Sequence, residues 1–125
     1  MFKMLLSIKP EHVENILHGS KQVEFRKVRC RHEINQIIIY STAPVMQVVA
    51  EAFVDEIITG DILDVWRLTK AYAGISYNDF RKYYKGKKTA VAYKLCEVVR
   101  YPEPKTLADF GVSHAPQSFL YLATT

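Results

Sequence analysis

Residues 4–27 read MLLSIKPEHVENILHGSKQVEFRK, and this stretch determines how the fold begins. Its first apolar run, 4–8, predicts a short strand. Pro10 suits the first position of a helix, because the amide that proline lacks would be unpaired there. From 10 to 18 the apolar residues recur at helical spacing, and Gly19 supplies the left-handed conformation that commonly ends a helix. A strand therefore leads directly into a helix that ends near residue 18.

An alternating segment, residues 22–27, follows this helix. Val23 and Phe25 fall on one face and polar residues fall on the other, as in a half-buried strand. Glu24 and Arg26 therefore share the polar face, with their Cα atoms about 7 Å apart. Such a pair offers one ligand both a hydrogen-bond acceptor and a cation.

The rest of the chain predicts further strands and two more helices. The expected elements are strands over 34–40, 45–58 and 89–101, helices capped by Asp61 and Ser76, a helical turn at 107–110 and an apolar segment at 119–122. Pro102 and Pro104 are expected to end the strand over 89–101. This order predicts an α+β fold, a small mixed β-barrel with helices at its rim.

The composition is that of an ordinary globular protein. Of the 125 residues, 49% are apolar and 24% are charged, which is enough to bury a core in one domain over residues 1–125. Cys30 and Cys96 form no Cys-x-x-Cys pair, and we expect both to be reduced thiols. Lys9 and Glu11 interrupt the apolar start too early for a signal peptide or a membrane span. These features predict a cytoplasmic protein without a membrane segment.

The sequence contains no pattern for a nucleotide cofactor or a metal ion. Its five glycines are isolated from one another, which excludes a glycine-rich phosphate loop. His12 and His18 lie on different helical faces, and the four histidines lack a metal-binding spacing. We therefore interpret the histidines as ordinary exposed residues and expect neither a metal nor a cofactor.

Charged residues are unevenly distributed along the chain, whose net charge is +4. Residues 21–31 hold five cations and one glutamate, and residues 81–88 hold five cations without an acid. A basic run is often a solvated helix face, so the run at 81–88 is left open between that role and a nucleic-acid site. Residues 51–64 hold five acids and no base, which allows a protein-interaction role.

Two motifs flank the first helix: Ile8-Lys9-Pro10 before it, and a Gly-x-Lys-x-x-Glu-x-Arg pattern from Gly19 to Arg26 after it. Further characteristic segments are Tyr40-Ser41, Ala43-Pro44, Gly86-Lys87 and Ala115-Pro116-Gln117-Ser118-Phe119. Together these segments span nearly the whole chain and resemble the ASCH domain family, a group within the PUA-like superfamily.

The resemblance implies a PUA-type β-barrel with a basic cleft that accepts RNA or a modified nucleotide. It implies that Lys21, Glu24 and Arg26 line the cleft, with Lys9, Ser41, Gln117 and Ser118 nearby. The alternation of the second strand agrees in placing Glu24 and Arg26 on one face. From composition alone, such a face is more often a solvated surface with weak ion pairs, but the family resemblance favours the cleft. The oligomeric state stays open.

Some ASCH-like proteins are small amidohydrolases that deacylate a modified cytidine, and their site resembles this chain at Lys21. Glu24 occupies the position of their threonine, and the region of their helical glutamate reads Tyr72-Ala73-Gly74-Ile75, so the match is incomplete. Lys21 and Glu24 can still act as a general acid and base on a modified nucleoside or on RNA. Two functions therefore stay open: an RNA- or nucleotide-binding domain, and a small hydrolase.

Overall fold

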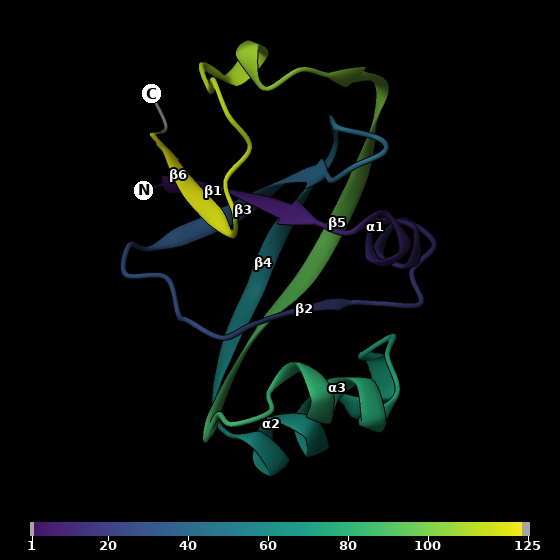
Figure 1. Cartoon of the computed structure of the whole chain (residues 1–125), viewed down its shortest axis with the longest axis vertical. Helices are drawn as coiled ribbons and strands as arrows, with labels where there is room; N and C mark the ends of the chain where they lie inside the picture. The colour runs from purple at the N-terminus through teal and green to yellow at the C-terminus, as the bar shows by residue number, and fades with distance from the viewer. Residues whose placement is uncertain (1, 124–125) are drawn as a thin grey trace.

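The computed structural model describes residues 2–123, in which strands alternate with short helices (Figure 1). The strands are β1 (Phe2–Ile8), β2 (Val23–Arg26), β3 (Ile34–Ser41), β4 (Gln47–Asp61), β5 (Thr89–Lys105) and β6 (Phe119–Ala123). The helices are α1 (Pro10–Leu17), α2 (Ile62–Thr69) and α3 (Tyr77–Tyr83), with 3-10 turns at Lys70–Tyr72 and Ala108–Phe110. The expected α+β class is confirmed.

The six strands form one sheet in the order β2-β5-β4-β3-β1-β6. β1 and β3 are parallel, and every other neighbouring pair is antiparallel. β4 and β5, with 15 and 17 residues, run side by side across the molecule (Figure 1). β1 pairs with β6 so that Phe2 lies opposite Ala123. The sheet therefore has two edge strands, β2 and β6.

The sheet is not closed, so the barrel that we expected is only partly formed. No backbone ladder joins β2 to β6 in residues 2–123. Instead, the Arg26 side chain at the end of β2 donates hydrogen bonds to the Ser7 carbonyl of β1 at 2.8 Å and to the Ser118 hydroxyl, next to β6, at 3.3 Å. β2 is only four residues long, so a long side chain spans the gap that a longer strand would fill.

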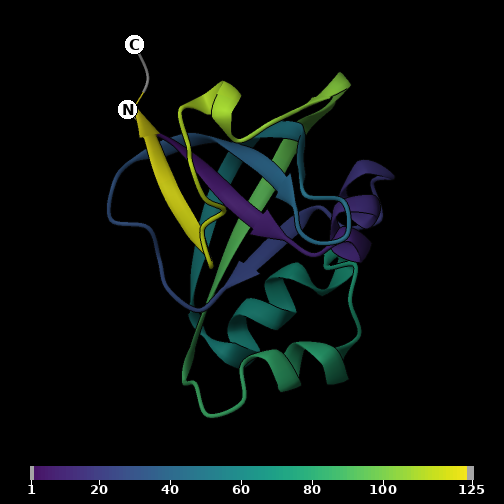
Figure 2. The ribbon, with the colours of Figure 1, turned by 45° about the horizontal axis from the view of Figure 1, so that its top comes forward.

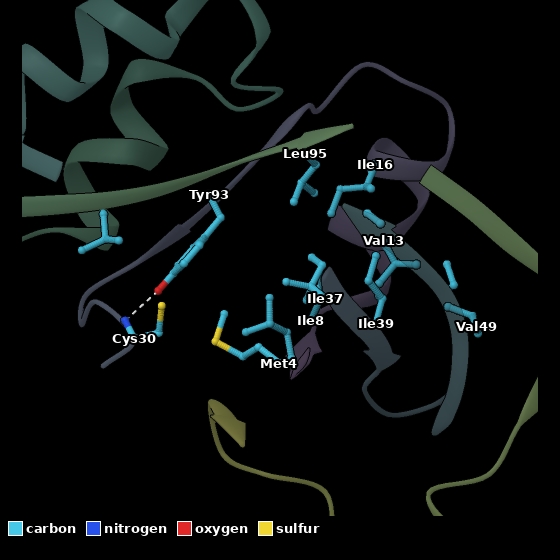
Figure 3. Close-up of a cluster of buried hydrophobic side chains, with 14 residues drawn as sticks. Met4, Ile8, Val13, Ile16, Cys30, Ile37, Ile39, Val49, Tyr93 and Leu95 are labelled. Atoms are coloured by element: carbon cyan, nitrogen blue, oxygen red, sulfur yellow. Dashed lines mark hydrogen bonds between the residues drawn. The ribbon is translucent and has the colours of Figure 1, made fainter. Parts of the chain in front are cut away.

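The largest group of buried side chains lies between α1 and the sheet (Figure 3). Val13 and Ile16 are the buried residues of α1, and they pack against apolar residues of β1, β3 and β5. Tyr93 of β5 is fully buried there, and its hydroxyl accepts a hydrogen bond from the Cys30 amide at 2.9 Å. Cys30 and Cys96 are both free thiols. This packing holds α1 in place against the sheet, next to the end of β1.

A second buried group holds α2 and α3 against one end of β2 and β5 (Figure 2). Phe80 of α3 lies between Phe25 and Trp66, with ring centroids 5.0 and 4.9 Å away. Both expected helix caps are confirmed, because the side chains of Asp61 and Ser76 accept hydrogen bonds from first-turn amides at 3.0 and 3.1 Å. None of the helices in residues 2–123 is long and apolar enough to span a membrane.

β5 continues through Pro102 and Pro104 to Lys105, so the expected end of this strand was wrong. Its pairing with β2 spans Val91 to Lys94, and beyond Lys94 β5 has a ladder with β4 alone. A proline lacks an amide hydrogen, but this is tolerated in a strand that has an unpaired side.

Candidate functional site

A cavity of about 610 Å³ lies where the end of β1, the start of α1, β2 and α3 meet. Its volume is in the range that suits a small ligand or one nucleotide of a longer strand. Six of the seven residues implied by the family resemblance line it: Lys9, Lys21, Glu24, Arg26, Gln117 and Ser118. The structure therefore brings together side chains that are far apart in the sequence.

Ser41, the seventh implied residue, does not line the cavity. It is buried at the end of β3, opposite Ile8 in the parallel ladder. Thr42 follows it into the cavity wall, and the Thr42 amide donates a hydrogen bond to the Ile8 carbonyl at 3.0 Å. Ser41 therefore lies beside two lining residues, Ile8 and Thr42, without lining the cavity itself.

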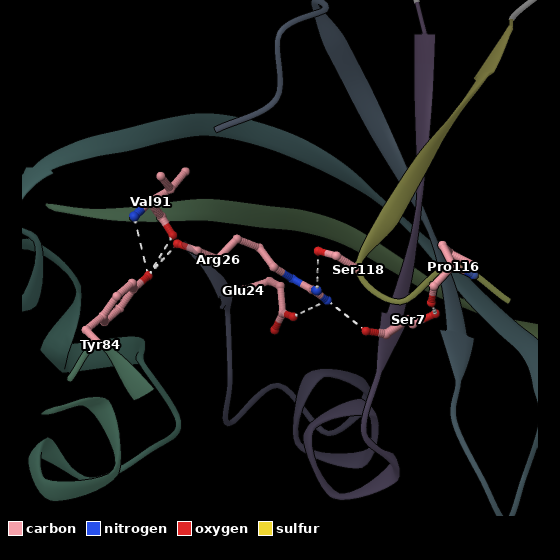
Figure 4. Close-up of polar contacts among 7 residues, drawn as sticks. All are labelled: Ser7, Glu24, Arg26, Tyr84, Val91, Pro116 and Ser118. Atoms are coloured by element: carbon pink, nitrogen blue, oxygen red, sulfur yellow. Dashed lines mark hydrogen bonds and ion pairs between the residues drawn. The ribbon is translucent and has the colours of Figure 1, made fainter. Parts of the chain in front are cut away.

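Ser7 attaches the C-terminal segment to the end of β1. Its amide donates to the Ser118 carbonyl at 3.1 Å, and its hydroxyl donates to the Pro116 carbonyl at 2.6 Å (Figure 4). These bonds place Gln117 and Ser118 beside the first turn of α1, although about a hundred residues separate them in the sequence.

Arg26 lies at the centre of the polar contacts (Figure 4). Its Nη2 is 2.8 Å from Glu24 Oε2 and also donates to the Ser7 carbonyl, while Nη1 donates to the Ser118 hydroxyl. The guanidinium thus joins β2 to the end of β1 and to the tail at Ser118. Its Nε–H is buried and left without a hydrogen-bond partner among the described residues.

Glu24 and Arg26 are a buried ion pair, with side-chain exposures of 8% and 11%. The alternative drawn from composition alone, a solvated face with weak ion pairs, is therefore wrong. Alternation correctly placed the two residues on one face. The tail at Ser118, which accepts a hydrogen bond from Arg26, contributes to this burial, and no local pattern reveals that contact.

Lys21 is 3% exposed, and its Nζ donates a hydrogen bond to the Ala73 carbonyl at 3.3 Å. The same nitrogen lies 5.0 Å from the centre of the Phe25 ring. Burial is the main cause that lowers the pKa of Lys21, the Glu24 carboxylate opposes this shift, and Arg26 adds to it. A lower pKa makes the ammonium a stronger acid.

Gly74 contacts the backbone and side chain of Lys21. Its φ is +67°, and a Cβ at this position would lie 2.4 Å from the Lys21 Cβ. Only glycine fits there. The region in which the family's amidohydrolases have a glutamate therefore offers Lys21 a carbonyl, from Ala73, and no carboxylate.

His12 lines the cavity from the first turn of α1 and was not expected there. Its side chain is 32% exposed, its Nδ1 is buried without a hydrogen-bond partner in the described chain, and its Nε2 lies 3.8 Å from Glu11 Oε1. Burial lowers the pKa of His12, and the nearby Lys21 charge lowers it further. The interpretation of His12 as an ordinary exposed histidine was wrong. Its position three residues after Lys9, one helical turn away, was the available sequence indication.

The cavity is balanced in charge rather than basic. Lys9, Lys21 and Arg26 face the three carboxylates of Glu11, Glu24 and Asp79. Asp79 and Tyr83 come from α3, and sequence reasoning missed both because the contact between α3 and β2 depends on tertiary packing. In residues 2–123 no group of three or more histidine, cysteine, aspartate or glutamate residues could hold a metal ion.

The acidic run at 51–64 does not form a separate patch, because four of its five carboxylates have local partners. Glu51 accepts a hydrogen bond from Gln36, Asp55 pairs with Lys94, Asp61 caps α2, and Asp64 pairs with Arg67. These contacts give the run a structural role.

No known family model matches this chain. It is 33% identical over 92 residues to an ASCH domain-containing ribonuclease from Zymomonas mobilis, a match that covers 73% of this chain and 62% of that protein. It is also 28% identical over 120 residues to a protein named ATP synthase subunit alpha in Ureaplasma parvum serovar 3. That match covers 95% of this chain but only 15% of the Ureaplasma protein. The chain thus spans less than two thirds of either relative.

The structure is similar to the crystal structure of ASCH from Zymomonas mobilis, with a TM-score of 0.86 and 28% sequence identity. The superposition covers 97% of this chain and 87% of that one. Together, the sequence match and the agreement of the folds confirm the expected resemblance to the ASCH domain family.

Proposed function

We propose that the chain binds single-stranded RNA, with one nucleotide seated in the cavity around Arg26. The observation that carries this proposal is that cationic, aromatic and amide side chains all line the same cavity. Lys9 and Lys21 can neutralise phosphate, the partly exposed Tyr83 ring can stack on a base, and Gln117 can hydrogen-bond to a base edge. The ribonuclease name of the Zymomonas relative supports RNA as the partner.

Binding of a fluorescently labelled RNA ten-mer, measured by anisotropy at low and moderate salt, tests the proposal. We expect Tyr83→Ala to weaken binding about tenfold, the effect of losing one base-stacking contact. Tyr77→Ala is the matched control, because Tyr77 is also on α3 and has the same 37% exposure but does not line the cavity. Failure of the parent protein to bind at low salt would refute the proposal.

A second candidate function is cleavage of the bound RNA, and His12 is the observation that favours it. Its lowered pKa keeps the imidazole neutral and able to accept a proton near pH 7. In this scheme His12 takes the proton of a ribose 2′-hydroxyl, and the 2′-oxygen forms a bond to phosphorus. The bond from phosphorus to the 5′-oxygen breaks, and the Lys21 ammonium gives that oxygen a proton. The products are a 2′,3′-cyclic phosphate and a 5′-hydroxyl.

Cleavage of end-labelled RNA, with the cyclic phosphate identified by mass spectrometry, tests this chemistry. We expect His12→Gln to lower the rate at least about a hundredfold, the usual effect of losing a general base, while RNA binding is retained. A DNA strand of the same sequence lacks the 2′-hydroxyl and must resist cleavage. If His12→Gln and Lys21→Met both cleave like the parent, the activity belongs to a contaminant and this candidate fails.

We also propose a cytoplasmic location. The two free thiols, Cys30 and Cys96, support it because unpaired cysteines are typical of reducing compartments.

A further inference from the structure

A second cavity, of about 590 Å³, lies between the start of α2, the end of α3 and the turn that leads into β5. Five cationic side chains and one carboxylate line it: Arg81, Lys82, Lys85, Lys87, Lys88 and Asp61. The lining thus has an excess of four positive charges, which equals the net charge of the whole chain. The first cavity, by contrast, is balanced.

These positive charges are not neutralised within the protein. In the part of the chain that the structure describes, none of the five cations forms an ion pair. The one acid, Asp61, is already occupied as the cap of α2, because its Oδ1 accepts the Leu63 amide at 3.0 Å. Five like charges in one place repel one another unless a polyanion is bound.

The turn that carries the lysines has a defined shape. The Lys85 amide donates to the Lys82 carbonyl at 3.3 Å, and the Lys87 amide donates to the Tyr84 carbonyl at 2.9 Å. Gly86 between them has a φ of +79°, which favours glycine. α3 ends at Tyr83, so Lys85 and its neighbours lie on this turn and not on a solvated helix face.

The two cavities share α3, which joins them physically. Asp79 and Tyr83 line the first cavity, while Arg81 and Lys82 line the second. A helix of seven residues is about 10 Å long, and three stacked nucleotides cover about the same distance. One short strand can therefore contact both cavities.

We propose that the second cavity binds the phosphodiester backbone of the same RNA strand that places a nucleotide in the first cavity. This inference rests on the proposed RNA binding. Exposed lysines bind phosphates as point charges without reading sequence, so this cavity supplies affinity and the first cavity supplies the selective contacts. The charge balance of the first cavity explains why a second phosphate-binding surface is needed.

Comparing two double variants of equal charge tests the inference. Lys85→Gln/Lys87→Gln removes two charges from the second cavity, and Lys70→Gln/Lys105→Gln removes two exposed lysines that line neither cavity. Affinity for the RNA ten-mer is measured at several salt concentrations. We expect the first variant to reduce the slope of log affinity against log salt by about 1.4, or about 0.7 for each lost phosphate contact. The control variant keeps the slope of the parent.

The outcomes separate this inference from the proposed function. If the parent binds RNA and the two double variants have the same slope, the second cavity is not a backbone site, while RNA binding in the first cavity stands. If the parent binds no RNA, both proposals fail. If the parent binds polyglutamate as tightly as RNA, and Lys85→Gln/Lys87→Gln weakens both equally, the site recognises acidic protein and the inference is overturned.

Discussion

Glu24 and Arg26 form a buried ion pair, so each charge needs the other to offset the cost of its burial. Glu24→Gln leaves the Arg26 guanidinium buried without its counter-ion, and we expect the free energy of unfolding to fall by about 3 kcal/mol. Urea denaturation measures this loss. Glu103→Gln, at an exposed position without an ion pair in residues 2–123, is the control and should be neutral. A Glu24→Gln variant of unchanged stability that no longer binds RNA would instead assign Glu24 to the ligand.

Gly74 is the residue on which the position of Lys21 depends. Gly74→Ala adds a methyl group 2.4 Å from the Lys21 Cβ and also strains a backbone with positive φ. Gly111→Ala is a matched control, because Gly111 has a similar φ of +72° but no atom within 4 Å of the added methyl. We expect the control to cost about 1 kcal/mol and Gly74→Ala at least about 2 kcal/mol more, measured by urea denaturation. Equal losses would show that Lys21 can move aside at little cost.

At the scale of elements, the Tyr84 hydroxyl, just after the end of α3, adds polar contacts with the sheet to the apolar packing of Phe80. Tyr84 Oη lies 2.8 Å from the Arg26 carbonyl and 3.1 Å from the Val91 carbonyl, either of which can accept its one hydrogen, and it accepts a hydrogen bond from the Val91 amide at 3.3 Å (Figure 4). These backbone groups lie where the ladder between β2 and β5 ends, at the pair Arg26 and Val91. The hydroxyl therefore completes the hydrogen bonding of the ladder and fixes α3 beside the first cavity.

Tyr84→Phe removes this hydroxyl and leaves buried backbone groups unpaired, so we expect a loss of about 2 kcal/mol in the free energy of unfolding. Tyr83→Phe, one residue earlier, removes a hydroxyl that makes no hydrogen bond within residues 2–123 and should change stability by less than about 0.5 kcal/mol. Thermal and urea denaturation compare the two variants. If Tyr84→Phe lowers the free energy of unfolding no more than Tyr83→Phe does, the Tyr84 hydroxyl contributes little, and the packing of the rings holds α3.

Element boundaries that depend on local chemistry could be predicted from the sequence. Asp61 and Ser76 were identified as caps because a capping side chain bonds only to its own helix. The continuation of β5 through Pro102 could not be predicted, since it depends on which side of β5 lacks a neighbour. Turn and cap chemistry is thus local, whereas the tolerance of a proline is decided by the sheet.

At the scale of the whole molecule, the pH dependence of folding reflects the burial of His12. Its pKa is lowered in the folded state, mainly by burial, so the unfolded chain binds more protons than the folded chain between that lowered value and the ordinary value of 6.5. The free energy of unfolding must therefore increase as the pH rises through this interval. Urea denaturation at several pH values below 6.5 measures the slope, and His12→Gln should make it smaller. An unchanged slope in the variant would show that other groups cause the dependence.

In the candidate site, too, features set by neighbouring residues could be predicted from the sequence, and features set by tertiary packing could not. The spacing of Glu24 and Arg26 on one strand face was predictable, and the family resemblance pointed to Gln117 and Ser118. His12, Asp79 and Tyr83 were not predicted as site residues, because their place in the wall depends on how α1 and α3 pack on the sheet. Likewise, alternation indicates that Glu24 is polar but does not indicate that it is buried.

The pairing of Phe2 with Ala123 has a consequence for how this fold can be built into other proteins. Residues opposite each other in an antiparallel ladder have Cα atoms about 5 Å apart, so the chain enters and leaves the fold at nearly the same point. A host protein could therefore accept the whole unit within one surface loop without separating its own neighbouring segments. For the same reason, the order of the strands along the chain could be circularly permuted while the sheet order stays the same.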